Sequence, residues 1–486
     1  MKTRFFSTAL AILAVTCGVV SAAEPPPLEA CEKALEKAVA FFHGKVAIHG
    51  GYAFQRPLDL SYAEAEHGKG LNLISIQPPG TTTVGLVFLE AWRATGNEAY
   101  LKASRDAAEA LIQCQLASGG WPAEFDFEPE EAKKYHLQAD VRKGDVETGK
   151  RRNHSTLDDN KTESALQFLL ELAHEPSMKD DEALQNAVQV GMDALLGAQA
   201  PNGAWPQQFD RPADPSLPVK EASFPETWPR EFPKVDYRGF YTLNDGNHLH
   251  CIEVLILAHE LTGEERYLEA AKKAGEFLLM ARLPQPQPVW AQQYDFDMHP
   301  VWARKFEPPA ASSAESAGAM EALVRLWGAT GETKYVDVYP EVLAWFKKTQ
   351  LPDGRWARFY ELETNRPLYC QAETYKVTYD DSDLPTHYGF KIDESMGRKM
   401  DRWGSVIAAG IDKFRRDKAG PTRPESWAKE ARSVASAAKK AIETLDDEGR
   451  WVRDGMIDTA DFIRNARALA QCIEALKKSG AESGDR

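Results

Sequence analysis

Two similar acidic phrases have the composition of a metal site. Residues 156–159 (TLDD) and 242–245 (TLND) each precede a stretch with helical spacing of apolar residues. Carboxylate and amide oxygens are the hard ligands that calcium prefers. The same residue types also serve as helix N-caps, and capping is the alternative for each phrase taken alone. Because the phrase is repeated, we predict a calcium site formed by Asp158, Asp159 and Asp245.

A basic residue follows on a proline-rich loop. Arg304 lies within residues 300–309 (PVWARKFEPP), where prolines and aromatic residues fix the chain at the rim of an active site. A surface ion pair is the alternative, and a similar phrase at residues 356–360 (WARFY) shows that part of this signal belongs to a repeat. The sequence contains no phosphate-binding loop, dinucleotide fingerprint, serine nucleophile elbow or zinc-binding His-Glu-x-x-His helix.

The elements that must position these residues are helical hairpins. The phrase Gln-x-x-x-Gly-x-Trp closes helical stretches at residues 115–121, 199–205 and 350–356, with degenerate copies ending at Trp290 and Trp451. A second phrase, Thr-Gly-Asn/Glu, marks a turn within the hairpins at residues 95–97, 262–264 and 330–332. Long repeats of this kind predict hairpins stacked around a ring. We therefore expect an all-α fold, an α/α toroid (incomplete α/α barrel) whose long loops form a central groove.

Tryptophan is abundant, with twelve residues in the chain. The tryptophans of the repeat can act as plugs that close the hairpin ends inside the core, or some can line the groove and stack on sugar rings. Trp302, beside several prolines, suits the stacking role better than Trp121 does.

The N-terminus has the pattern of an export signal. Residues 1–23 combine Lys2 and Arg4 with an apolar run and small residues, which predicts a secretory signal peptide. Residues 24–475 would then form one catalytic domain and residues 476–486 a polar tail. We expect a secreted or periplasmic monomer that does not bind membranes once the signal is cleaved.

Net charge limits the classes of binding partner, and the cysteines indicate how many disulfide bonds to expect. The net charge of −15 disfavours nucleic acid as a partner. An acidic substrate would require an arginine cluster or a divalent cation. Five cysteines remain after the signal, an odd and scattered set that favours buried thiols over a disulfide framework, with at most one or two bridges.

The chain resembles the pectate lyases of polysaccharide lyase family 10 from about residue 50 to 402. The resemblance rests on the two acidic phrases and several further segments: Gly50-Gly51-Tyr52, residues 77–81, Gly119-Gly120-Trp121, Trp302-Ala303-Arg304 and residues 358–367. It implies an α/α toroid that cleaves polygalacturonate, or a related uronan, by calcium-assisted β-elimination.

The resemblance also implies roles for individual residues. Asp158 and Asp245 match the calcium-handling aspartates of the family, and Arg304 matches its catalytic arginine. An arginine base implies an alkaline pH optimum, because its unperturbed pKa exceeds about 12. We expect the remaining groups to bind substrate, the arginines by pairing with uronates at neighbouring subsites; these groups are Arg358, Arg366, Arg398, Trp302 and Tyr360.

The sequence departs from the family pattern in the substrate clamp. Residues 371–374 (QAET) stand where members have an Arg-Asp-Gly turn, and residues 394–399 (ESMGRK) stand where members have paired arginines before an aromatic residue. Residues 246–248 (GNH) also differ, and residues 127–153 and 210–240 form longer segments than the family needs.

Other functions remain open. One alternative is a metal-independent glycoside hydrolase of the α/α toroid type, in which paired carboxylates do acid–base work. A non-catalytic carbohydrate-binding relative is another. Terpene cyclases share the Gln-x-x-x-Gly-x-Trp phrase, but their Asp-x-Asp-Asp acid is missing, since residues 380–383 read DDSD.

Overall fold

The structure is a computed structural model that describes residues 24–480. Its longer helices are α1 (Leu28–Phe41), α2 (Thr81–Thr95), α3 (Glu98–Gln113), α6 (Lys161–Ala173), α7 (Glu182–Gly197), α8 (Asn247–Thr262), α9 (Glu265–Met280), α10 (Ser313–Thr330), α12 (Tyr339–Thr349), α13 (Ser395–Ala409), α14 (Ile411–Ala419), α15 (Pro424–Thr444) and α16 (Thr459–Ser479). The short helical turns are η1 (Phe42–Val46), α4 (Pro129–Ala132), α5 (Gln138–Val141), η2 (Asp158–Asn160), η3 (Pro176–Met178), η4 (Asn244–Gly246) and α11 (Lys334–Asp337).

Strands are short and serve the ends of the hairpins. They are β1 (Gln55–Pro57), β2 (Ala63–Glu64), β3 (Lys69–Gly70), β4 (Leu73–Ser75), β5 (Glu124–Asp126), β6 (Ser155–Thr156), β7 (Gln208–Phe209), β8 (Tyr241–Thr242), β9 (Gln293–Tyr294), β10 (Ala311–Ser312), β11 (Trp356–Ala357), β12 (Phe359–Tyr360), β13 (Pro367–Cys370), β14 (Val377–Thr378), β15 (Lys391–Ile392), β16 (Val452–Arg453) and β17 (Met456–Asp458).

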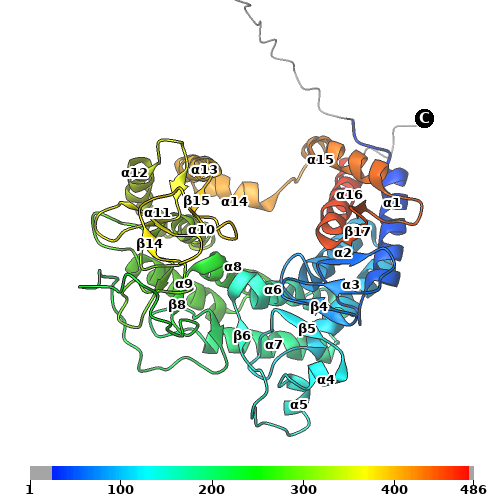
Figure 1. The fold of residues 1–486 in the computed structure, drawn as a ribbon. Helices are drawn as coiled ribbons and strands as arrows, with labels where there is room; N and C mark the ends of the chain where they lie inside the picture. The colour runs from blue at the N-terminus through cyan, green and yellow to red at the C-terminus, as the bar shows by residue number, and fades with distance from the viewer. Residues whose placement is uncertain (1–23, 481–486) are drawn as a thin grey trace, which may run out of the picture.

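The helices form an open ring of hairpins (Figure 1). Helices α16, α2, α6, α8 and α10 follow one another around the inside, and each packs on the next. Helices α1, α3, α7, α9 and α12 form the outer layer (Figure 1). The predicted α/α toroid is confirmed, because paired inner and outer helices around a ring define this fold.

The Thr-Gly phrase forms the turn between an inner helix and its outer partner. Gly96, Gly263 and Gly331 end α2, α8 and α10 in the left-handed conformation, each donating its N–H to a carbonyl four residues earlier. Only glycine adopts this conformation without a side-chain clash, which explains why it follows each inner helix.

The Gln-x-x-x-Gly-x-Trp phrase fastens the other end of each hairpin. Gln115 donates its amide to the carbonyl of Gly119 in its own turn at 2.8 Å and to that of Ala187, on the next outer helix, at 3.0 Å. Gln199 repeats this arrangement with Gly203 and Ala270. The phrase therefore joins neighbouring repeats.

The tryptophans of the repeat are core plugs. Each indole Nε1 donates to a carbonyl near the end of the preceding outer helix, at 2.7 to 2.9 Å, and each ring is buried. These residues are Trp121, Trp205, Trp290, Trp356 and Trp451. Of the two interpretations of the repeat tryptophans, the structure supports the plug for these five.

Short antiparallel ladders bring the start of each inner helix to the end of its outer helix. Strand β6 pairs with β7, so that Ser155 opposes Phe209, and β8 pairs with β9, so that Tyr241 opposes Tyr294. Strand β4 pairs with β5, and β10 with β12, in the same way. Loops after the outer helices therefore lie beside the N-termini of the inner helices.

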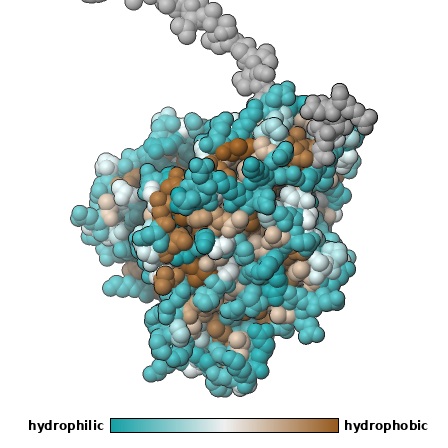
Figure 2. Space-filling model, turned by 90° about the vertical axis from the view of Figure 1, so that its right-hand side faces the viewer, coloured by the Kyte–Doolittle hydropathy of each residue, from teal (hydrophilic) through white to brown (hydrophobic). Residues whose placement is uncertain are grey.

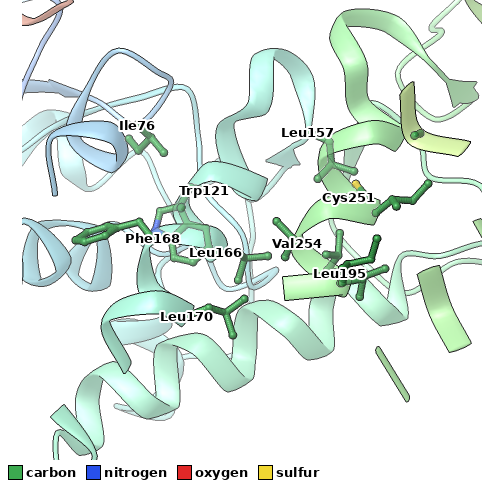
Figure 3. Close-up of a cluster of buried hydrophobic side chains, with 14 of the residues drawn as sticks. Ile76, Trp121, Leu157, Leu166, Phe168, Leu170, Leu195, Cys251 and Val254 are labelled. Carbon is green, nitrogen blue, oxygen red and sulfur yellow. The ribbon is translucent and has the colours of Figure 1, made fainter. Parts of the chain in front are cut away.

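The core runs continuously between the two helix layers. Leu166, Phe168 and Leu170 of α6 are buried in one cluster with Leu195 of α7 and Val254 of α8 (Figure 3). Hydrophilic side chains cover most of the outer face that includes α1, with hydrophobic residues exposed near its centre (Figure 2). No helix among residues 24–480 is long and apolar enough to cross a membrane.

The structure describes only one of the two predicted terminal boundaries. The predicted signal peptide, residues 1–23, lies outside the described residues. The expected polar tail begins later than residue 476, because α16 continues to Ser479 and Leu476 packs in the core at 8% exposure. Its apolar spacing carries the last turn into the core, which the surrounding lysines obscured in the sequence.

Candidate active site and metal centre

The two acidic phrases adopt the same local structure. The hydroxyl of Thr156 accepts the N–H of Asp158 at 3.3 Å, and the hydroxyl of Thr242 accepts that of Asn244 at 3.3 Å. The phrases then form the turns η2 and η4, which contact each other across the ring interior. Equivalent positions of neighbouring repeats are thereby brought to one place.

The final aspartate of each turn has an unusual backbone conformation. Asp159 has φ 51° and Asp245 has φ 50°, in the left-handed region that non-glycine residues avoid. Residues held there cost about 1–3 kcal/mol and concentrate at functional sites. Because the same conformation occurs at the same position in two repeats, we infer that it serves the function of these carboxylates.

The capping alternative does not account for these carboxylates. The N-cap residues of α6 and α8 are Asn160 and Gly246, and neither helix start receives a side-chain capping hydrogen bond. The aspartates are instead directed at one another.

The three predicted ligands form a compact oxygen cluster. One carboxylate oxygen from each of Asp158, Asp159 and Asp245 lies within 4.8 Å of the others. Calcium binds oxygens at about 2.3–2.6 Å, so ligands on opposite sides of one ion are about 5 Å apart. The spacing therefore fits a single calcium ion, and all three residues are partly exposed, which leaves room for substrate or water.

Neighbouring side chains orient the cluster. The amide of Gln207 donates to Asp158 at 2.8 Å, and the buried ammonium of Lys161 lies 3.1 Å from Asp159 and 3.7 Å from Asp158. The amide oxygen of Asn244 is buried without a hydrogen-bond partner, beside Asp245. An orphaned acceptor next to three carboxylates is a further feature that suits a cation.

The charge balance of the site is negative. Five carboxylates, those of the three aspartates together with Glu307 and Glu315, face the three cationic groups of Lys161, Arg304 and Arg358. Burial and then the neighbouring carboxylates, Asp159 foremost, raise the pKa of Asp245 to about 7, although Arg304 opposes the rise. An excess of two negative charges is what one divalent cation would neutralise.

Arg304 reaches the cluster from the loop after β9. Its Nη2 lies 3.5 Å from an oxygen of Asp158 and 3.4 Å from one of Asp245, while its Nε lies 3.5 Å from Glu307. The sequence-predicted base and the sequence-predicted ligands therefore meet, although they come from three different parts of the chain.

Glu307 fixes the backbone of this loop. Its side chain accepts the N–H of Arg304 at 2.9 Å, and its own N–H donates to the Arg304 carbonyl at 2.9 Å. The hydroxyl of Tyr388 donates to the other oxygen of Glu307 at 2.9 Å. Burial disfavours the charge of Arg304, but Glu307, Asp158 and Asp245 outweigh burial and raise the pKa of the guanidinium. Without a cation, Arg304 is thus held protonated.

Arg358 lies one layer away from the aspartates. Its Nη2 pairs with buried Glu315 at 2.9 Å, and its guanidinium lies 4.6 Å from the centre of the Tyr388 ring. Its Nε is buried without a partner. Burial opposes the charge of Arg358, yet Glu315 and the other anions raise its pKa. The side chain of Arg358 is 14% exposed, but its Nε is not part of the exposed surface.

The other predicted substrate-binding residues lie in different surroundings. Arg366 is exposed on the loop before β13 and stacks on Tyr379 at 3.4 Å, and Arg398 is 71% exposed on α13, with Glu394 at 3.8 Å. The sequence patterns suggested a shared role for these arginines, but the structure does not bring Arg366 or Arg398 into the contacts around Arg304.

Two aromatic residues turn out to be internal. Tyr360 is fully buried and donates its hydroxyl to the Thr349 carbonyl at 2.6 Å, so a substrate cannot reach it in this structure. Trp302 is only 2% exposed and donates Nε1 to the Pro229 carbonyl at 2.8 Å. The prediction of sugar stacking by Trp302 and that of substrate binding by Tyr360 are corrected, because both rings are packed inside the protein.

The longer segment at residues 210–240 supports the Arg304 loop. Besides the bond to Trp302, the amide of Gln293 donates to the Tyr237 carbonyl, and Lys220 pairs with Asp297. Arg230 from this segment stacks on Trp228 at 3.9 Å and pairs with Glu361 at 2.8 Å. An insertion that the sequence shows only as extra length thus builds one wall of the site.

Sequence reasoning missed several residues of the site. Lys161 lies two residues after the first acidic phrase, and Glu307 lies three residues after Arg304 within residues 300–309, so both stood in or beside motifs that were already singled out. Glu315, Tyr388 and Gln207 gave no local signal, because only the fold brings them near.

Comparison with known proteins gives one family match over part of the chain. Residues 130–355 match the family model described as pectic acid lyase. This span contains the three aspartates and Arg304, whereas Arg358 lies just beyond it. A search of curated proteins gave no match.

Several solved structures are similar to the chain. A family 10 polysaccharide lyase from Cellvibrio cellulosa is 20% identical, with a TM-score of 0.45, covering 68% of this chain and 97% of that chain. A mutant of that lyase in complex with trigalacturonic acid is 19% identical, with a TM-score of 0.46, covering 67% and 98%. An α-1,6-mannanase from Salegentibacter sp. HEL1_6 is 12% identical, with a TM-score of 0.40, covering 92% and 98%. The ring of hairpins described above establishes the fold independently of these likenesses.

The family match and the aspartate–arginine site fall on the same residues. The sequence-based recognition is therefore confirmed over this span: residues 130–355, just under half of the chain, match the pectic acid lyase family.

Proposed function

We propose that the protein cleaves polygalacturonate, or a closely related uronan, by calcium-assisted β-elimination with Arg304 as the base. The observation that carries this proposal is the position of Arg304 Nη2, 3.5 Å from Asp158 and 3.4 Å from Asp245. A proton acceptor next to a cation site is the arrangement required to remove a proton α to a carboxylate.

A divalent cation fits the residues present. Asp158, Asp159 and Asp245 would hold it, and its two positive charges match the excess negative charge of the site. When bound, calcium would supply positive charge beside the substrate carboxylate and beside Arg304, which acidifies the C5 proton and favours the neutral guanidine.

The residues of the chain perform the remaining steps. Arg304 accepts the C5 proton at a guanidine nitrogen while Glu307 fixes the loop from which it projects. The C5–H electron pair forms the C4=C5 double bond, the C4–O bond breaks, and the departing oxygen takes a proton from solvent. We assign Arg358, whose side chain is 14% exposed, to pair with a uronate carboxylate.

The substrate class follows from the same charges. An acidic protein repels an acidic polymer, so binding depends on local cations. Arg358 and the proposed calcium ion supply them, and Arg230 and Arg366 lie near the insertion wall, both within reach of Tyr379. We further propose that the protein acts as a monomer outside the cytoplasm, where such a polymer is accessible.

The decisive experiment follows ultraviolet absorbance during incubation with polygalacturonate, in calcium and in EDTA. Only elimination creates the conjugated double bond, so absorbance should rise in calcium and stay flat in EDTA. Polymannuronate and highly methyl-esterified pectin, run in parallel, define which uronan is preferred.

Other outcomes separate the alternatives. New reducing ends without ultraviolet absorbance, unaffected by EDTA, would identify a metal-independent hydrolase. Binding of polygalacturonate without any cleavage would identify a carbohydrate-binding relative.

A further inference from the structure

Two cysteines lie at the junction between the first and last helices. Cys31 belongs to α1 and Cys472 to α16, and both side chains are fully buried. Helices α1 and α16 pack side by side where the two ends of the chain meet (Figure 1). This contact joins parts of the chain that are far apart in sequence.

The packing of the two helices places the cysteines at the same level. Phe42, just after α1, stacks on Phe462 of α16 with ring centroids 3.7 Å apart. Cys31 precedes Phe42 by about three helical turns, and Cys472 follows Phe462 by about three turns, roughly 15 Å in each case. Because the helices are antiparallel, both cysteines lie in the same direction from the aromatic pair.

A second contact confirms this register near the cysteines. Lys477 of α16 pairs with Glu32 of α1 at 2.8 Å, so the residue adjoining Cys31 faces the last turns of α16. Both cysteines belong to the hydrophobic core between the helices. Both side chains are buried in this part of the core.

The two thiols influence each other electrostatically. The contact between them raises the pKa of the Cys31 thiol and lowers that of the Cys472 thiol. The other cysteines differ: among the described residues, Cys114 and Cys370 contact backbone carbonyls, and Cys251 contacts Glu163 and Asn247. Only one pair is therefore arranged for oxidation.

We propose that Cys31 and Cys472 form a disulfide bond that ties the first helix covalently to the last. The two S–H bonds break and one Sγ–Sγ bond forms. Two electrons and two protons pass to a small-molecule or protein disulfide, which is reduced to two thiols. The bond would close almost the whole chain into one loop, the situation in which a cross-link restricts the unfolded chain most.

Peptide mapping tests the pairing directly. The full-length purified protein is incubated with oxidised glutathione, denatured, alkylated and digested, with a sample reduced first as reference. We expect a linked peptide pair containing Cys31 and Cys472, while Cys114, Cys251 and Cys370 remain fully alkylated. Complete alkylation of all five thiols after oxidation, or a bridge between any other pair, would overturn the proposal.

Thermal unfolding tests the consequence. The melting temperature of the oxidised protein should fall by ~3 °C in dithiothreitol, the effect expected for a typical disulfide in a chain of this size. The Cys31→Ala/Cys472→Ala double variant should show no dependence on dithiothreitol. Cys114→Ala, a matched buried control, should keep the full dependence. A double variant that responds to dithiothreitol as the wild type does would contradict the assignment, as would an oxidised wild type that does not respond.

Discussion

Replacing Arg304 by lysine tests the catalytic assignment most sharply. Arg304 meets carboxylates through two different nitrogens: Nη2 faces Asp158 and Asp245, and Nε faces Glu307. A lysine keeps the positive charge, but its single nitrogen cannot maintain both sets of contacts. The fold should survive, while the proton acceptor is lost or displaced.

The magnitude follows from the role. A missing general base costs about 10²–10⁴ in rate, equivalent to about 3–5 kcal/mol of transition-state stabilisation. We therefore expect Arg304→Lys to lower kcat by ~10²–10⁴ with KM changed less than about threefold. Ultraviolet initial rates over a range of polygalacturonate concentrations in saturating calcium provide both constants.

Two matched variants define the outcome. Arg358→Lys should mainly raise KM, because we assign this residue to a substrate carboxylate and not to the proton transfer. Arg105→Lys should change neither constant, since its guanidinium pairs with Asp181 and Glu109 on outer helices. If Arg358→Lys lost kcat and Arg304→Lys only raised KM, the roles would be reversed. If Arg304→Lys retained wild-type kcat and KM, Arg304 would have no part in the reaction.

Four further perturbations have defined outcomes. Asp158→Ala or Asp245→Ala should abolish ultraviolet-detected activity and leave helical circular dichroism intact, because the carboxylates lie outside the core; unfolding of both variants would favour a purely structural role. Calcium should raise the melting temperature more at pH 8 than at pH 5, because the pKa of Asp245 is about 7 and a proton competes with the cation below that value; equal shifts would argue against this ligand. Burial lowers the pKa of His248 to about 3. As the pH falls from ~6.5 to ~3, only the unfolded chain binds a proton at this residue, so the free energy of unfolding should fall by about 1.4 kcal/mol per pH unit. Denaturant titrations should show a smaller pH dependence in His248→Gln. Gly203→Ala should lower the free energy of unfolding by more than ~3 kcal/mol, because a Cβ at this position (φ 96°) would lie 2.1 Å from the Lys273 carbonyl oxygen. Gly263→Ala (φ 72°) meets open space and should cost only ~1 kcal/mol in the same titrations.

The repeat could be recognised from sequence because its chemistry is local. The Thr-Gly turn, the glutamine and the tryptophan each act within a few residues of their own helix, as the bonds of Gln115 to Gly119 and of Trp121 to Leu111 show. A local requirement recurs at a fixed place in every hairpin, so it leaves a repeated phrase. The toroid follows from counting those phrases.

The metal cluster could be predicted for a related reason. The phrases at residues 156–159 and 242–245 occupy equivalent positions of neighbouring hairpins, and equivalent positions of a ring lie side by side. The sequence alone did not show whether these aspartates bind a metal or cap the helices that follow them. That distinction depended on the backbone of Asp159 and Asp245, whose left-handed conformation turns the carboxylates away from the helix amides.

The surroundings of Arg304 were decided by tertiary structure alone. Tyr360 and Trp302 looked suitable for a sugar because aromatic residues on loops can face either way, and here packing turned both inward. Glu315 and Tyr388 entered the site from segments without any repeated phrase. A local pattern specifies which residue types stand at a helix end, but their exposure and charge partners depend on which distant loops cover them, and only the folded chain sets those contacts.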